Sequence, residues 1–281
     1  MTITVFALVL AAAVFHAGWN AVVKVNADKF AVISVIKVTQ IALALPLLPV
    51  VGFLSSGAWS YLLASTAIHT GYYYFLRVSY NHGDLSYIYP VSRGTSPLLV
   101  AVGSVVLIGE TLTTQATISL IVIAVGIMSL SLANKRNGIA DGKALCFALG
   151  TGVCTAGYTL MDAIGARLAS DALCYIVWLT VMNGLPTLLI ALLQRRSLLI
   201  RRMKAVGRPG ILGGFVATAA YGIVIWASTV APIALVSAIR ETSMVFAVLF
   251  GVSLLEEKLD YIKQLAIGLT LLGVVLMRVN V

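Results

Sequence analysis

The sequence predicts an all-α integral membrane protein in which ten transmembrane helices form two inverted five-helix repeats around a central cavity. Three observations lead to this fold class. The 281 residues are 60% hydrophobic and only 10% charged, whereas about 25% of the residues in a soluble domain are charged. The apolar segments are long enough to cross a bilayer, which takes about 20 residues per helix. The two halves of the chain also share motifs at a nearly constant spacing.

The apolar segments are separated by short polar or glycine-containing connections, which define the expected helix boundaries. No basic stretch precedes the first apolar segment and no small-residue cleavage site follows it, so it is interpreted as a membrane helix and not as a cleaved signal peptide. The predicted spans are 3–23, 31–54, 58–80, 85–108, 114–133, 142–164, 172–193, 208–230, 233–255 and 260–279.

A repeated set of motifs indicates that the chain is a duplicated unit. Arg93–Ser96 (RGTS) matches Arg240–Ser243 (RETS) at an offset of 147 residues. Glu110–Leu112 matches Glu257–Leu259 at the same offset of 147. Two earlier matches have an offset of 139 or 140, and the basic connection 194–208 accounts for the difference: they are Ala17–Trp19 with Ala156–Tyr158 and Leu45-Pro46 with Leu185-Pro186. We therefore predict a first repeat over residues 1–137 and a second over residues 138–281.

Charge indicates that the second repeat is inverted. The connection after span 31–54 contains no Lys or Arg, whereas the equivalent connection after span 172–193 contains six. Equivalent loops with opposite charge are expected when a unit with an odd number of helices is duplicated, and inverted repeats are typical of alternating-access transporters.

The basic residues also predict the orientation. Only Arg167 and Arg278 lie on the side of the termini and even-numbered connections, and the larger set should be cytoplasmic. We therefore expect a bacterial-type inner (plasma) membrane protein with both termini outside the cytoplasm. The larger set contains fourteen residues: Lys24, Lys29, Arg77, Lys135, Arg136, Lys143, Arg195, Arg196, Arg201, Arg202, Lys204, Arg208, Lys258 and Lys263.

Two arginines within predicted spans are the strongest functional signal. Arg93 and Arg240 are equivalent in the two repeats, and each costs about 2.5–3.5 kcal/mol at a helix centre. Either they bind an anionic group such as a substrate carboxylate, or they cap backbone carbonyls. Pro97 favours the second alternative, because proline has no N–H to donate to the carbonyl of Arg93, four residues earlier. Glu241 is a second partner for either arginine and our candidate for a proton-coupling group.

Aromatic and polar residues on the same predicted helices are suited to an amphipathic solute. Some of the tyrosines and tryptophans can equally belong to the interfacial belts, and Gly103, Gly126, Gly268 and Gly273 are interpreted as helix-packing residues. The candidate substrate-binding residues are Trp19, Asn20, His69, Tyr73, Tyr89, Arg93, Ser96, Tyr158, Tyr221, Arg240 and Ser243.

Other classes of function are disfavoured. The sequence has no nucleotide-binding loop, no nucleophile motif and no histidine spacing typical of a metal site, so neither a cofactor, a metal nor an enzymatic activity is expected. The three cysteines Cys146, Cys154 and Cys174 have no CxxC pairing. The net charge of +9 lies mainly in connections, which argues against a nucleic-acid partner. Secondary transport, by facilitated diffusion or weakly coupled exchange, is the economical interpretation.

The run Gly83-Asp84…Pro90…Arg93-Gly94 and the turns Gly109–Leu112 and Glu257–Leu259 resemble the EamA branch of the drug/metabolite transporter superfamily. Among its members the chain is similar to the bacterial amino-acid exporters, including the aromatic amino-acid type. The resemblance implies a basket of ten helices with a central cavity lined by helices 1, 3, 4, 6, 8 and 9. Many members have cytoplasmic termini, in contrast to the charge distribution here.

We therefore predict a secondary exporter of small zwitterionic metabolites, amino acids with aromatic or other sizeable side chains above all. Its expected partners are a small-molecule substrate and the lipid bilayer, and a monomer suffices. The alternatives are an exporter of organic cations, drugs or other small metabolites, in which the aromatic residues bind an amine, and an integral-membrane enzyme or assembly subunit.

Overall fold

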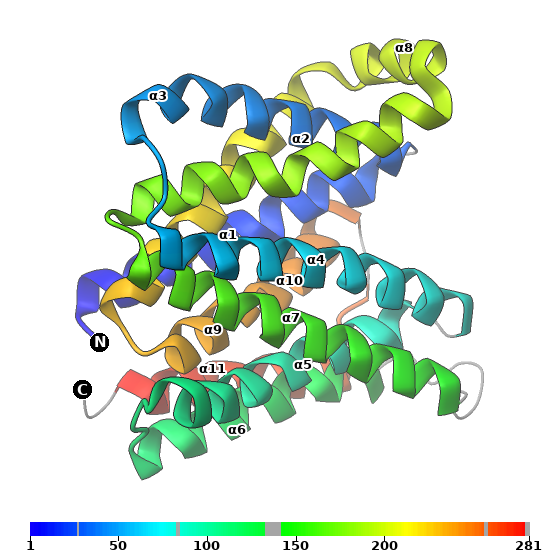
Figure 1. Cartoon of the computed structure of the whole chain (residues 1–281). Coiled ribbons are helices and arrows are strands. Elements are labelled where there is room, and N and C mark those ends of the chain that lie inside the picture. The colour runs from blue at the N-terminus through cyan, green and yellow to red at the C-terminus, as the bar shows by residue number, and fades with distance from the viewer. Residues whose placement is uncertain (27, 83–84, 133–141, 256–257, 279–281) are drawn as a thin grey trace.

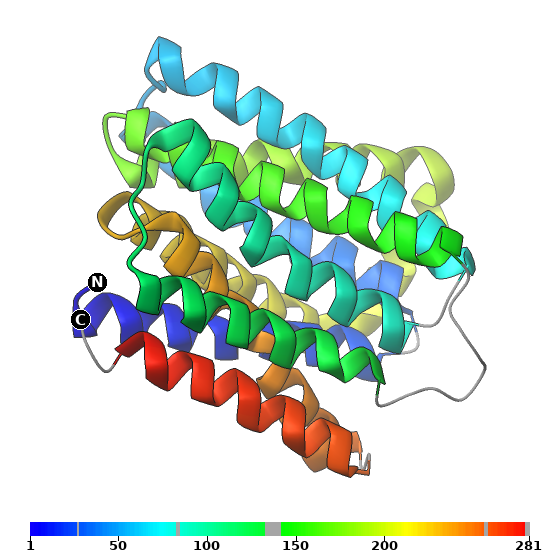
Figure 2. The same cartoon turned by 90° about the horizontal axis from the view of Figure 1, so that it is seen from below.

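The computed structural model describes every residue except 27, 83–84, 133–141, 256–257 and 279–281. The described residues form a bundle of long helices and short helical turns that cross the molecule side by side (Figures 1 and 2). The start of α1 and the end of α11 lie at the same end of the bundle. The boundary expected between residues 137 and 138 lies outside the described residues.

The first half of the chain begins with α1, whose first turn is capped by the Thr2 hydroxyl, and Asp28 and Thr113 cap α2 and α6 in the same way. A side-chain oxygen at this position accepts a hydrogen bond from one of the free backbone N–H groups in the first turn of the helix. Gly109 ends the helical segment of α5 at a φ of 75°, which glycine adopts without strain. The elements are α1 (Ile3–Val25), α2 (Lys29–Ala44), η1 (Leu45–Leu47), α3 (Leu48–Val51), α4 (Ser56–His82), α5 (Leu85–Gly103), the π-helical turn η2 (Ser104–Ile108), α6 (Thr114–Ser129) and η3 (Leu130–Leu132).

The second half contains one element that was expected as two helices. The ribbon of α8 crosses the molecule, turns at the far end and returns (Figure 1). Within α8, Gly207 has a positive φ of 55°. We call the part of α8 that starts at Ala172 its first arm and the part that ends at Val230 its second arm. The elements are α7 (Gly142–Leu168), α8 (Ala172–Val230), α9 (Ile233–Glu241), α10 (Ser243–Leu255) and α11 (Tyr261–Arg278).

Eight helical segments of the described chain are long and apolar enough to cross a membrane, which makes the protein a multi-pass membrane protein. Two predicted spans are not among them. Span 58–80, within α4, contains His69 and several tyrosines, and the first arm of α8 is apolar over the shorter stretch Ala172–Pro186. The eight segments are 3–25, 29–51, 87–108, 114–132, 142–168, 203–230, 233–253 and 261–278.

The contact between α6 and α11 at the edge of the bundle has a twofold character (Figure 1). A Cβ on Gly126 would meet Thr270 and Ala266, and a Cβ on Gly273 would meet Ile123 and Ser119. Residues 119, 123 and 126 of α6 correspond to residues 266, 270 and 273 of α11 at the offset of 147 found in the sequence. Each glycine therefore meets the equivalents of the residues that the other glycine meets. Small residues let helix backbones approach closely in a membrane.

Candidate functional site

A break between α9 and α10 places the first two site residues. Helix α9 ends at Glu241, and α10 starts at Ser243. Between them, Thr242 donates its hydroxyl to the Ile239 carbonyl at 2.6 Å and its N–H to the same carbonyl. Interrupted helices at membrane depth are tolerated where protein groups satisfy the freed backbone, and they recur at transporter binding sites. Arg240 and Glu241 form the last residues before this break.

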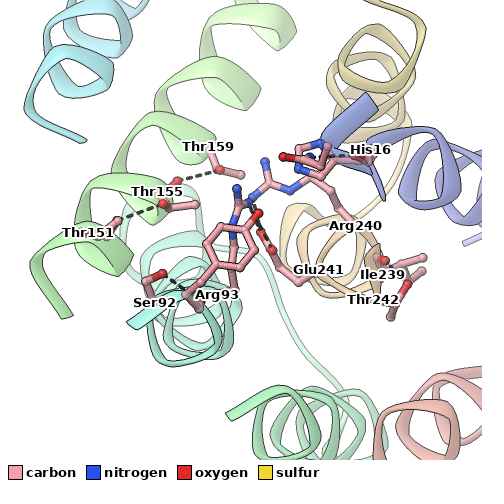
Figure 3. Close-up of polar contacts among 12 residues, drawn as sticks. His16, Ser92, Arg93, Thr151, Thr155, Thr159, Ile239, Arg240, Glu241 and Thr242 are labelled. Atoms are coloured by element: carbon pink, nitrogen blue, oxygen red, sulfur yellow. Dashed lines mark hydrogen bonds and ion pairs between the residues drawn. The ribbon is translucent and has the colours of Figure 1, made fainter. Parts of the chain in front are cut away.

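The two predicted arginines converge on one carboxylate (Figure 3). Arg240 Nη2 lies 2.6 Å from Glu241 Oε1, and Arg93 Nη1, from α5, lies 3.3 Å from Glu241 Oε2. Glu241 is fully buried, and both arginines are nearly so. The Arg93 guanidinium also lies over the Tyr89 ring, 5.0 Å from its centroid. Two guanidinium groups and one carboxylate leave a net charge of +1 in this buried cluster.

Several buried polar atoms around this cluster have no hydrogen-bond partner among the described residues. They are Arg240 Nε, Ser237 Oγ on the same helix, Ser96 Oγ one turn after Arg93, and His16 Nε2 on α1. Figure 3 shows the His16 ring beside the Arg240 side chain. Buried polar atoms are rarely left without a partner, so this group of donors and acceptors is suited to a polar ligand.

An aromatic group from α4 and α7 lies next to the cluster. The His69 ring stacks on Tyr158 with centroids 3.8 Å apart, and Tyr72 meets Tyr158 edge-on at 6.0 Å. Tyr73 contacts Tyr72 edge-on, but half of its surface is exposed. Tyr158 itself is buried. These rings combine apolar faces with polar tips, as sites for amphipathic solutes do.

A second buried carboxylate lies on α7. Asp162 is fully buried and accepts hydrogen bonds from the Tyr175 hydroxyl at 3.2 Å and the Tyr221 hydroxyl at 2.5 Å. Tyr175 belongs to the first arm of α8 and Tyr221 to the second. Asp162 therefore links α7 to both arms.

An ion pair joins the last turns of α7 and α8 to two connections at the end of the bundle where α1 begins. Arg167 donates to Glu110 at 2.7 Å, to the Ser228 carbonyl at 2.8 Å and to the Ala231 carbonyl at 3.0 Å. Glu110 also accepts a hydrogen bond of 3.0 Å from the N–H of Ile233, the first residue of α9. A surface pocket of about 380 Å³ lies beside this tie. The ends of α7, α8 and α9 are thereby held together.

Comparison with known proteins identifies the family. The sequence model of the EamA-like transporter family matches residues 142–279. This chain belongs to the EamA-like transporter family. It is therefore a membrane transporter of small molecules. No curated protein matches the chain.

The fold of this EamA protein recurs among solved structures. Matches extend to 29 chains. One of them, described only as "Crystal structure of protein", has a TM-score of 0.71 and 14% sequence identity, over 98% of this chain and 95% of that chain. At this identity the similarity shows the fold alone.

The structure brings some of the predicted site residues of the EamA protein together and separates others. It gathers Arg93 and Arg240 around Glu241, with Tyr89 against the Arg93 guanidinium and Tyr158 near it. Ser96 is buried one turn after Arg93, and His69 stacks on Tyr158. Trp19 meets His16 edge-on and packs against the buried cluster of Val32, Ile36 and Ala217, and Asn20 donates to the His16 carbonyl of its own helix. Tyr221 points to Asp162, and Ser243, which is buried, begins α10.

Two features of the site were not found from the sequence. The role of Tyr175 was missed because its apolar helix offers no periodic polar signal, and only the fold brings it to Asp162. The pair of Glu110 and Arg167 was missed because the residues are 57 positions apart in two different connections. The sequence showed only that a charged residue lies near each of two helix ends. That pattern does not tell which residue each of them contacts.

Proposed function

We propose that this EamA protein is a secondary transporter that exports small zwitterionic metabolites, including aromatic amino acids, by alternating access. The observation that carries the proposal is the buried cluster of Arg93, Arg240 and Glu241, whose net charge is +1. An unbalanced charge in the membrane interior is costly. The carboxylate of a substrate balances it, because guanidinium groups bind carboxylates with strong, charge-assisted hydrogen bonds.

Arg240 is the better candidate for direct contact with the substrate. Its Nη2 is engaged by Glu241, while its Nε has no partner among the described residues. Arg93 faces both oxygens of Glu241, at 3.4 and 3.3 Å, and lies over the ring of Tyr89. We assign Arg240 to the substrate carboxylate and Arg93 to the support of Glu241.

The aromatic residues supply the surface for the substrate side chain. Tyr158 is held by the stacked ring of His69, and Tyr72 packs against its edge. Tyr73 continues this surface with a half-exposed ring. Aromatic pairs add about 0.5–1.5 kcal/mol beyond the area that they bury, which favours substrates with aromatic side chains.

Alternating access requires two halves that move against each other. We propose ten spans in two inverted repeats, 1–137 and 138–281, around a central cavity. The reciprocal approaches of Gly126 and Gly273 support a duplicated unit. We further propose a bacterial-type inner membrane with external termini, on the charge bias of the connections. On this assignment the tie between Glu110 and Arg167 lies on the external side and closes it.

Counterflow in proteoliposomes tests the substrate site. Radiolabelled Trp or Phe should exchange through the wild-type protein, and Arg240→Ala should reduce the exchange at least tenfold, because a hydrogen bond to a charged group contributes about 1.5–3 kcal/mol. Arg208→Ala is the matched control, since Arg208 is an exposed arginine of α8. Unchanged exchange in both Arg240→Ala and Arg93→Ala would refute the carboxylate site.

A second function, the export of organic cations, is favoured by one observation. Asp162 is a buried carboxylate that accepts hydrogen bonds from Tyr175 and Tyr221, and aromatic rings with a nearby acid bind amines well. A counterflow screen of amino acids, amines and organic anions separates the two functions. Exchange of amines without exchange of amino acids would show that the substrate is an organic cation and not a zwitterion.

A further inference from the structure

The environment of Asp162 differs from that of the other buried carboxylate, Glu241. Glu241 is paired with two arginines. Asp162 forms no ion pair within the described residues, and its two oxygens receive hydroxyl groups from Tyr175 and Tyr221 instead. Both carboxylates are fully buried. Burial is therefore balanced by opposite charge at one site and by neutral donors at the other.

The groups that face Asp162 come from α4, α8 and α9. From α4, Ser65 faces the carboxylate and also lies 3.3 Å from His69 Nδ1. From α8 come the two tyrosines, and from α9 comes Arg240. The nearest cation is thus Arg240, whose guanidinium is already bound to Glu241 at 2.6 Å.

An ionised carboxylate without a counter-ion is unfavourable in a membrane interior. Neutral hydroxyl donors offset part of that cost, and proton binding removes the charge altogether. The two forms also need different surroundings: the ionised form only accepts hydrogen bonds, whereas the protonated form donates one. A proton on Asp162 therefore needs an acceptor among the hydroxyl groups of Tyr175, Tyr221 and Ser65, and a tyrosine that takes this role reorients its own hydroxyl.

We propose that Asp162 is a proton-binding site that couples substrate movement to proton movement in the opposite direction. This proposal rests on the proposed function, because it adds a coupling ion to the same transporter. The substrate leaves with no net charge, and Asp162 carries one proton inward. The assignment differs from the expectation that Glu241 is the coupling group, because Glu241 is already paired with two guanidinium groups.

The structure also suggests how protonation acts on the fold. Tyr221 is half-buried and belongs to the second arm of α8, whereas Tyr175 is fully buried in the first arm. Because the Tyr221 side chain is partly exposed, we place the route by which a proton reaches Asp162 along Tyr221 and its hydroxyl. Reorientation of this hydroxyl loosens the link between α7 and the second arm, which leads directly to α9 and Arg240.

Two measurements on the same proteoliposomes test the coupling. The wild-type protein should show counterflow of its substrate and substrate-dependent collapse of an imposed pH gradient, followed with an entrapped pH dye. Asp162→Asn should retain at least half of the counterflow and lose more than 90% of the substrate-dependent proton flux, because the amide keeps the shape but cannot ionise. Asp171→Asn is the matched control, since Asp171 caps the start of α8 and asparagine caps equally well; it should keep both activities.

Three outcomes would overturn the proposal: a wild-type protein that exchanges substrate without moving protons, an Asp162→Asn protein that keeps the proton flux, or a folded Asp162→Asn protein that loses counterflow as well. The first and second leave the proposed transport function intact, whereas loss of counterflow in the arginine variants removes that function separately. If Asp162→Asn does not fold, Tyr221→Phe gives a second test. Removing a donor to the ionised form should raise the pH of half-maximal proton coupling by about one unit, and an unchanged pH profile would equally refute the proposal.

Discussion

Replacing Gly126 with alanine should separate α6 from α11. The added Cβ would lie 2.5 Å from Thr270 Oγ1, 2.7 Å from Thr270 N and 3.1 Å from Ala266 O. The two backbone atoms cannot rotate away, so the helices must move apart by about 0.7 Å to restore an ordinary contact of about 3.4 Å. The Thr270 hydroxyl is also bound to Ala266 O at 2.8 Å, which limits its own reorientation.

The expected loss of stability follows from this overlap. Overpacking of a close contact costs about 1–3 kcal/mol. A change of about 2 kcal/mol lowers the Tm by about 4–8 °C in a protein of this size class, measured by thermal unfolding in detergent. Gly268→Ala is the control on α11, because a Cβ at Gly268 meets nothing within 4 Å. Its Tm should not fall and should rise by up to about 2–4 °C, since alanine favours a helix over glycine by about 1 kcal/mol.

The reciprocal variant Gly273→Ala extends the test. Its Cβ would lie 2.9 Å from Ile123 N and 3.0 Å from Ser119 O, so its destabilisation should be similar. One separation of the helices relieves both overlaps, and the double variant should therefore lose less stability than the two single variants together, by about 0.5–3 kcal/mol. Equal Tm values for Gly126→Ala and Gly268→Ala would refute the close approach, and strict additivity would refute the shared displacement.

Two further perturbations test other parts of the fold. Glu110→Gln weakens the charged contact with Arg167, so hydrogen–deuterium exchange at the Ile233 amide should accelerate; an unchanged rate would show that the tie does not hold this end closed. Glu241→Ala leaves two buried guanidinium groups unpaired and should lower the free energy of unfolding by about 3–5 kcal/mol, measured by thermal unfolding. Adding Arg93→Met should recover part of that loss, and no recovery would contradict a shared carboxylate.

Hydropathy and local motifs predicted the helical membrane fold and the family, because the cost of placing charge in lipid acts on each segment separately. The position of Arg93 and Arg240 within spans was visible for the same reason. The sequence also indicated that Gly103, Gly126, Gly268 and Gly273 are packing residues, and three of the four approach another helix closely, whereas Gly268 does not. Glycine content shows that a close approach is permitted, whereas the crossing point depends on how two helices are placed.

The sequence by itself determined that the chain is built from apolar membrane helices and which residues are costly within them. Only the tertiary structure decided how those residues are satisfied: it paired Glu241 with two arginines and left Asp162 to the hydroxyls of Tyr175 and Tyr221. The physical reason is that burial of a charge is a property of one position along the chain, whereas its compensation depends on groups that lie on other helices. Two carboxylates that look alike in sequence thus acquire different chemistry.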